Sequence, residues 1–202
     1  MKLYYSPGAC SLAPHIAIRE AGLPLDLVRV NVPKREVQGG ADFTLINPLG
    51  YVPVLAFDDG ETLTEGPAIL QFIADQAPAK ALAPAAGTRE RSRLHSWLSF
   101  INSELHQSLV TLFNADAHAS TRESVGVRLR GRLDWAARQL QGREYLVANR
   151  YSVADIYLFN IMSWLRHVGL SLSDWPELAA HSARVAGRPA VQAAIKAEAE
   201  VI

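Results

Sequence analysis

The stretch Lys2-Leu3-Tyr4-Tyr5-Ser6-Pro7-Gly8-Ala9-Cys10-Ser11 decides how the first part of the chain folds. Its apolar run predicts a buried strand that Pro7-Gly8 ends. An apolar helical pattern follows and stops at Gly22, a typical helix C-cap. Cys10 therefore lies where a strand passes into a helix, beside backbone amides with partial positive charge. Because that field stabilises a thiolate, we expect the Cys10 thiol to ionise readily.

Cys10 is the only cysteine of the sequence. A lone cysteine is often just a small buried apolar residue, and this alternative stays open here. Ala13 stands where a Cys-x-x-Cys motif would carry its second thiol. A dithiol cycle within the chain is therefore excluded, and disulfide exchange would need an external thiol.

The composition limits the classes of protein that the chain can belong to. Its 202 residues are 49% hydrophobic, which is enough for one large domain or two small ones. Twenty basic residues balance twenty acidic ones, so neither a nucleic acid nor an acidic membrane is expected as partner. We find no signal peptide and no apolar run near the ~18 residues of a membrane span. With its single cysteine, the chain is expected to be a soluble cytoplasmic protein.

Residues 1–77 have the pattern of a small α/β domain. Residues 25–30 alternate as a second strand, so strand, helix and strand predict a right-handed parallel βαβ unit. Asp58-Asp59-Gly60 predicts a hairpin turn between two further short strands. Thr64-Glu65-Gly66-Pro67 then opens a helix that reaches about residue 75. The expected layout has four strands.

The rest of the chain shows helical patterns only. Residues 78–87 are rich in Pro, Ala and Gly and predict a linker. Residues 88–202 predict an all-helical domain, with a capping box of about 1 kcal/mol at Ser152-x-x-Asp155. The expected helices cover about 88–115, 121–141, 153–168, 176–186 and 190–200.

An α/β thioredoxin-like N-terminal domain joined to an all-α C-terminal domain resembles a soluble glutathione S-transferase. The opening stretch with its cysteine at position 10 is similar to the bacterial beta class of that family. So are the segments Gly50–Leu55, Leu63–Gly66, Glu104–His106 and Ser152–Asp155. The resemblance covers nearly the whole chain. It implies a homodimer that uses glutathione as co-substrate and no metal.

The resemblance also implies a glutathione site. A cis bond at Val52-Pro53 would expose a backbone edge for the cysteinyl part of the tripeptide. Glu65-Gly66, at a helix start, would hold the γ-glutamyl group, and Arg35 a carboxylate. The residues implied to bind glutathione are Cys10, Arg35, Tyr51, Val52, Pro53, Glu65, Gly66, Ser99, Ser103, Glu104 and His106.

His106 and Cys10 are the implied catalytic residues. Helical spacing places Ser99, Ser103 and His106 in one polar stripe. From the sequence alone, such a stripe indicates a helix face exposed to solvent. The resemblance instead turns this face toward a cleft beside Cys10, where His106 would polarise a thiol. Tyr5 and Ser11 are further catalytic candidates, because other classes of the superfamily use a tyrosine or serine near the N-terminus. Tyr5 lies in the predicted strand and fits a core position better than a catalytic one, whereas Ser11 fits a helix cap equally well.

The expected function is a detoxifying conjugation of the glutathione thiolate to small apolar electrophiles. One alternative is glutathione-dependent thiol–disulfide exchange through a mixed disulfide at Cys10. Another is a non-catalytic carrier that binds apolar ligands in the same cleft. The chain departs from the family by having Ser99 where asparagine is common and Gln107 where lysine is often found.

Overall fold

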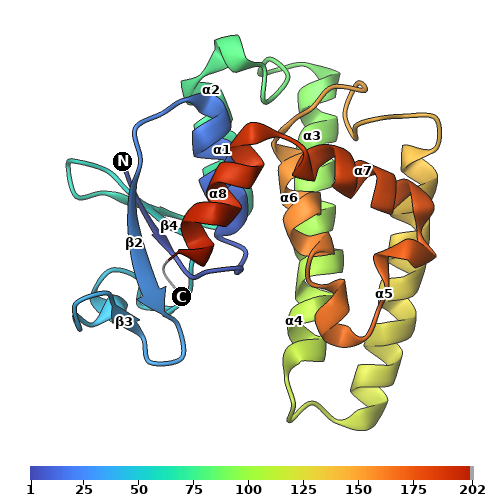
Figure 1. The fold of residues 1–202 in the computed structure, drawn as a ribbon, viewed down its shortest axis with the longest axis horizontal. Helices are drawn as coiled ribbons and strands as arrows, with labels where there is room; N and C mark the ends of the chain where they lie inside the picture. Colours follow the sequence, from blue (N-terminus) through green and yellow to red (C-terminus); the bar gives the residue numbers. More distant parts are fainter. Residues whose placement is uncertain (201–202) are drawn as a thin grey trace. The chain divides into compact units, whose positions relative to one another are not determined.

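A computed structural model describes residues 1–200 and shows two compact units (Figure 1). The first consists of Met1–Ala83 together with the chain from Arg188 onward, and the second consists of Pro84–Gly187. No helix formed by residues 1–200 is long and apolar enough to cross a membrane.

The first unit is built on a five-stranded sheet with the order β3-β2-β1-β4-β5. β1 pairs in parallel with β2, and α1 lies between them in sequence, which confirms the βαβ unit. β4 pairs antiparallel with both β1 and β5. The four-strand prediction missed β3, which is only two residues long and too short to show alternation. The strands are β1 (Lys2–Tyr5), β2 (Asp26–Asn31), β3 (Glu36–Val37), β4 (Val54–Ala56) and β5 (Thr62–Thr64).

Two helices of this unit carry the residues around the expected site. α1 (Leu12–Ala21) is buried along nearly its whole length, and Gly22 ends it at φ +69° with its amide bonded to Arg19 O. The predicted C-cap is therefore confirmed. α2 (Gly66–Gln76) begins with a glycine and has proline in its first turn, as the sequence predicts.

The last helix, α8 (Pro189–Ala199), packs against α1 (Figure 1). Arg188 precedes this helix and donates two hydrogen bonds to Glu20 of α1. Its Nε lies 2.6 Å from one carboxylate oxygen, and its Nη2 lies 3.0 Å from the other. The expected domains were 1–77 and 88–202 with a linker at 78–87. In the structure, the first unit instead runs to Ala83 and takes in α8. The amphipathic pattern of α8 shows that one side of the helix is buried. It does not show which helix or sheet covers that side.

The second unit is helical throughout its regular elements, close to the predicted ranges. Two boundaries differ: a π-helical segment interrupts the predicted helix 88–115, and the predicted helix 153–168 stops at Met162, before a 3₁₀ turn. All ten residues of α6 are buried, so it forms the centre of this unit. The elements are α3 (Arg89–Phe100), the π-helical segment Ile101–His106, α4 (Gln107–Phe113), α5 (Ala119–Leu140), α6 (Val153–Met162), the 3₁₀ turn Leu165–Val168 and α7 (Pro176–Ala186).

Candidate functional site

Cys10 lies in the turn between β1 and α1 and is partly exposed. Its thiol donates a hydrogen bond to the carbonyl oxygen of Val52, with Sγ at 3.3 Å. Burial raises the pKa of this thiol to about 12; the backbone amides of Cys10 and Ser11 lower the pKa, and the charge of Glu65 raises it. The expectation of ready ionisation is therefore wrong. Removal from water outweighs the field of the amides, although that field is present.

The peptide bond Val52-Pro53 is cis, as the resemblance implies. The loop before it is organised by Asn47, which is buried and bonded on both sides of its amide. Its Nδ2 donates to Tyr51 O at 2.7 Å, and its Oδ1 accepts from the amide of Leu49 at 3.1 Å. Sequence reasoning missed Asn47, because the Asn-Pro pair indicates only a turn.

Glu65 caps α2 with its backbone and leaves its side chain exposed. Its carbonyl accepts from the amides of Ala68 and Ile69 at 3.0 Å each. Its φ of +68° is sparsely populated by non-glycine residues and costs about 1–3 kcal/mol. Such conformations gather at ligand-binding sites. The Tyr51 hydroxyl donates to Oε1 of Glu65 at 3.4 Å, which aligns this carboxylate beside the start of α2.

Arg35 is exposed and has a left-handed backbone at φ +56°. Its side chain passes over Gly50, where an added Cβ would come within 3.2 Å of the Arg35 Nε. Gly50 itself has φ +74°, which favours glycine, and a side chain there would also displace that of Arg35 by a few tenths of an ångström. Three consecutive residues connect this region: Gly50 lies under the side chain of Arg35, Tyr51 bonds to Glu65, and Val52 accepts the bond from Cys10. The structure thus gathers the expected residues of the first unit into one contiguous group.

Tyr5 and Ser11 are placed as structural residues. Tyr5 is only 2% exposed, and burial, followed by the charge of Glu198, raises its pKa despite the opposing effect of Arg29. The Ser11 hydroxyl accepts from the amide of Ser6 at 3.1 Å and donates to its carbonyl at 3.2 Å. These bonds close the turn that carries Cys10. A catalytic role for either residue stays a prediction.

His106 is the last residue of the π-helical segment and bonds to other polar residues of the second unit. Its Nδ1 lies 2.8 Å from the Tyr157 hydroxyl, which in turn donates to Oδ1 of Asn102 at 2.8 Å. Burial lowers the pKa of His106 to about 4, so the imidazole is neutral at physiological pH. Sequence reasoning missed Tyr157 and Asn102. A tyrosine 51 positions away gives no local signal.

The other members of the polar stripe differ from His106 in their surroundings. Ser99 and Ser103 are exposed, and the Ser103 hydroxyl donates to Ser99 O at 2.9 Å. The Glu104 carboxylate accepts from Nε of Arg132 at 2.8 Å. The solvated-face alternative therefore describes the two serines but not His106, which is largely shielded from water.

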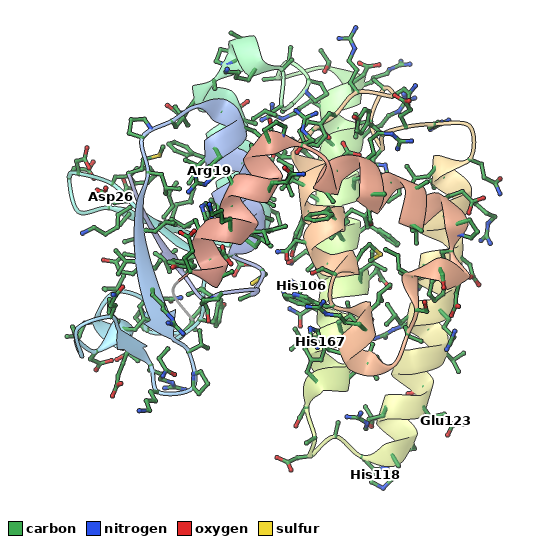
Figure 2. The ribbon with its side chains drawn as sticks, in the orientation of Figure 1. Arg19, Asp26, His106, His118, Glu123 and His167 are labelled. Carbon is green, nitrogen blue, oxygen red and sulfur yellow. The ribbon has the colours of Figure 1, made fainter. Side chains whose placement is uncertain are left out.

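A row of aromatic rings extends from His106. Its imidazole lies 5.1 Å from the Trp164 ring, which lies 5.6 Å from Phe113. Phe113 lies 6.5 Å from His167, and Figure 2 shows His106 and His167 on the same side of the helical unit. Phe113 itself is 42% exposed. Neighbouring rings are inclined to one another by 58–75°, so the row is an aromatic cluster next to the imidazole, with Phe113 as its exposed apolar member.

Within residues 1–200, no group of three or more His, Cys, Asp or Glu side chains is arranged to hold a metal ion. The described residues place charged and polar groups near Cys10 in the first unit, and an imidazole with aromatic neighbours in the second.

Comparison with known proteins gives consistent results. Residues 8–76 match the family model "Glutathione S-transferase, N-terminal domain", and residues 100–189 match "Glutathione S-transferase, C-terminal domain". The chain is 39% identical over 198 residues to glutathione S-transferase GstA of Escherichia coli O157:H7, with 98% of each chain covered.

Solved structures agree with the curated relatives. A ternary complex of BphK, a bacterial glutathione transferase, is 53% identical with a TM-score of 0.96, covering 98% of this chain and 100% of that one. The beta-class enzyme of Sphingomonas chungbukensis is 49% identical with a TM-score of 0.94 and 98% of each chain covered. A sphingomonad glutathione S-transferase complexed with glutathione is 47% identical, with a TM-score of 0.94 and coverage of 98% and 99%.

Fold, family models and full-length similarity agree: the chain belongs to the glutathione S-transferase family and is a transferase of the thioredoxin-like glutathione transferase fold, with glutathione as its co-substrate.

Proposed function

We propose that this protein conjugates the thiolate of glutathione to small apolar electrophiles, with glutathione bound by the residues gathered in the first unit. The observation that carries the proposal is the contiguous group from Arg35 to Glu65. Its charges and backbone groups match those of the tripeptide. Glutathione has two carboxylates, one ammonium group and one thiol.

Each part of glutathione finds a counterpart in the first unit. The guanidinium of Arg35 suits the glycyl carboxylate, since its planar fork can bind both oxygens. The Val52 backbone before the cis proline suits the cysteinyl part. The start of α2 suits the γ-glutamyl carboxylate, and the Glu65 side chain its ammonium. A sphingomonad relative has been solved in complex with glutathione, which supports glutathione as the ligand.

Activation of the thiol needs a shift of its pKa. An unperturbed thiol titrates near ~8.5, so only a few per cent is thiolate at neutral pH. Lowering that pKa by two units takes about 2.7 kcal/mol of selective stabilisation. The amides of Cys10 and Ser11 act on the Cys10 sulfur, and the same field would reach a glutathione sulfur beside it. Within the second unit, the neutral imidazole of His106 has a ring nitrogen whose lone pair can accept a hydrogen bond.

The electrophile would lie on the aromatic row of the second unit. Trp164 and Phe113 are spaced at 5.6 Å, within the range of favourable ring contacts. A planar aromatic electrophile could pack on the exposed ring of Phe113, and such an aromatic pair is worth about 0.5–1.5 kcal/mol beyond its buried area. We therefore propose small aromatic electrophiles as the preferred substrates.

Thiol–disulfide exchange through Cys10 is disfavoured by the state of its thiol. Because burial raises the pKa of the Cys10 thiol to about 12, little of it is thiolate at pH 7. Because the thiolate is the attacking species, a mixed disulfide would form slowly. A non-catalytic carrier predicts ligand binding without turnover, which an assay distinguishes directly.

A homodimer is supported by aromatic side chains on the surface of the second unit. Trp97, Phe100 and Trp135 form a partly exposed cluster with ring centroids 4.6–5.7 Å apart. Exposed aromatic clusters are typical of interfaces. Trp135→Arg should shift the protein from dimer to monomer in light scattering, and an unchanged mass would argue against this surface. A cytoplasmic location stays a prediction from the single cysteine.

The proposed function is tested by glutathione-column retention followed by conjugation of a chlorodinitrobenzene. Wild type should be retained and should turn over the substrate. Glu65→Gln should raise the KM for glutathione about 10- to 100-fold, which corresponds to losing a charged hydrogen bond of about 1.5–3 kcal/mol. Glu61→Gln, an exposed acid four residues earlier, is the matched control. Retention of apolar dyes without turnover would support the carrier instead.

A further inference from the structure

Glu198 is a buried carboxylate on α8 that the proposed function does not use. It is 4% exposed, and both of its oxygens are bonded. Oε1 lies 2.9 Å from Nδ1 of His15, which is 0% exposed, and Oε2 accepts from the backbone amide of Gly8 at 2.9 Å. Carboxylates are almost never buried unless they are paired and hydrogen-bonded. These contacts are therefore specific partners of this charge.

The direction of the bonds around His15 follows from Arg19. The Nε–H of Arg19 donates to Nε2 of His15 at 2.8 Å, and arginine stays protonated. Nε2 must then carry the lone pair, so Nδ1 carries the proton and donates to Glu198. Arg19 lies exposed on α1 (Figure 2). A surface cation is thus connected through a buried neutral imidazole to the buried carboxylate, whose other oxygen holds Gly8.

Gly8 belongs to the turn that carries Cys10. It has φ +70°, and a Cβ added to it would meet nothing within 4 Å. The space where a side chain would stand is therefore open, and the Gly8 amide is bonded to Glu198. Ser6 and Ser11 tie the two ends of the turn to each other. In the middle of this turn, the Gly8 amide bonds to Glu198, which lies on a helix 190 residues further along the chain.

We propose that Glu198 is a positioning residue for catalysis: it holds the Gly8 amide so that the amides of Cys10 and Ser11 stay aimed at the glutathione sulfur. This inference rests on the proposed function. The amide field acts over short distances, and a misplacement of about 1 Å can cost about 100-fold in rate. His15 and Arg19 act through Glu198, because they fix the orientation of its carboxylate.

The experiment compares Glu198→Ala, Glu198→Gln and the control Glu200→Gln, an exposed acid two residues later on the same helix end. We expect kcat with a chlorodinitrobenzene to fall about 10-fold in Glu198→Ala and less in Glu198→Gln, which keeps one acceptor oxygen. The KM for glutathione should stay within about 2-fold. The pKa of the bound glutathione thiol, measured by ultraviolet difference titration, should rise in both variants. Glu200→Gln should match wild type in all three measurements.

A purely structural role would lower thermal stability without moving the pKa of the bound thiol. An unchanged kcat and thiol pKa in a folded Glu198 variant would overturn the inference while leaving the proposed function intact. If Glu198→Ala does not fold, Glu198→Gln decides by the same criteria.

If wild type itself does not conjugate, the proposed function fails, and so does positioning for that reaction. Amide hydrogen exchange can then still test whether the bond between Glu198 and the Gly8 amide holds the turn in place. It should show Gly8 and Cys10 losing protection in Glu198→Ala, which has no acceptor for the Gly8 amide, while the amides of α8 keep theirs. Equal protection in wild type and variant would show that Glu198 does not hold the turn.

Discussion

The hydroxyl oxygen of Tyr157 lies 2.8 Å from Nδ1 of His106. The same hydroxyl donates its proton to Oδ1 of Asn102 at 2.8 Å, so it can only accept from the imidazole. His106 therefore carries its proton on Nδ1 and presents the lone pair of Nε2. Asn102 and His106 both belong to the π-helical segment, a type of local distortion that is frequent at functional sites. Tyr157 comes from the fully buried α6 and fixes the tautomer.

Tyr157→Phe should release this tautomer. We expect kcat for conjugation to fall about 10-fold, because only part of the imidazole population would then present Nε2 as an acceptor. The KM for glutathione should stay within about 2-fold, and the free energy of unfolding should fall by about 1–2 kcal/mol. Steady-state kinetics, urea unfolding and ¹⁵N chemical shifts of the imidazole check these effects. Tyr145→Phe, outside both residue groups, is the control. A variant that keeps kcat and the Nδ1–H tautomer would contradict this role.

The depressed pKa of His106 makes stability depend on pH. The folded value of about 4 lies below the usual 6.5, so between these values the unfolded chain binds a proton that the folded protein does not. This contribution is fully present above pH 6.5 and is lost as the pH falls toward 4. It amounts to at most about 3 kcal/mol. Urea unfolding of wild type and His106→Gln at pH 7 and pH 4.5 should show the steeper loss in wild type. Parallel losses would contradict the shift.

Cys10 should be a slow nucleophile in the folded protein. Because burial raises its pKa to about 12, alkylation by iodoacetamide at pH 7.5 should be at least about 100-fold slower than that of free glutathione. The rate should rise above pH 10. The urea-unfolded chain is the control and should react at an ordinary rate. Conjugation in Cys10→Ala should stay within about 3-fold of wild type. Fast alkylation in the folded state would restore thiol exchange as a competing function.

The sequence predicted those elements of the fold that depend on residues close together in the chain. The turn at Pro7-Gly8, the Gly22 cap and the parallel βαβ unit all follow from residues close in the chain. The cis bond at Val52 followed only from the family resemblance. The packing of α8 and the bond between Glu198 and Gly8 could not be predicted, since they join residues far apart in sequence. The pKa of Cys10 depends on burial by the whole fold, which no local pattern gives.

Asp155 shows how a correct local prediction can understate an interaction. The capping box is present, with Oδ2 of Asp155 accepting from the amide and the hydroxyl of Ser152, each at 2.9 Å. A cap of this kind is worth about 1 kcal/mol. Asp155 is also 0% exposed, and its Oδ1 accepts from the amide of Leu146 at 3.0 Å and lies 3.0 Å from Nε2 of His181. One carboxylate therefore joins three segments of the second unit.

Asp155→Ala should consequently cost much more than the cap alone. It leaves the buried amides of Ser152 and Leu146 without their acceptor, and we expect a loss of about 3–5 kcal/mol in the free energy of unfolding. Ser152→Ala, which removes only one hydroxyl, should lose about 1 kcal/mol. Urea unfolding of the two variants at pH 7 measures the difference, and equal m-values would show that the unfolded states are comparable. Equal losses in the two variants would mean that the bonds to Leu146 and His181 add nothing to the capping box.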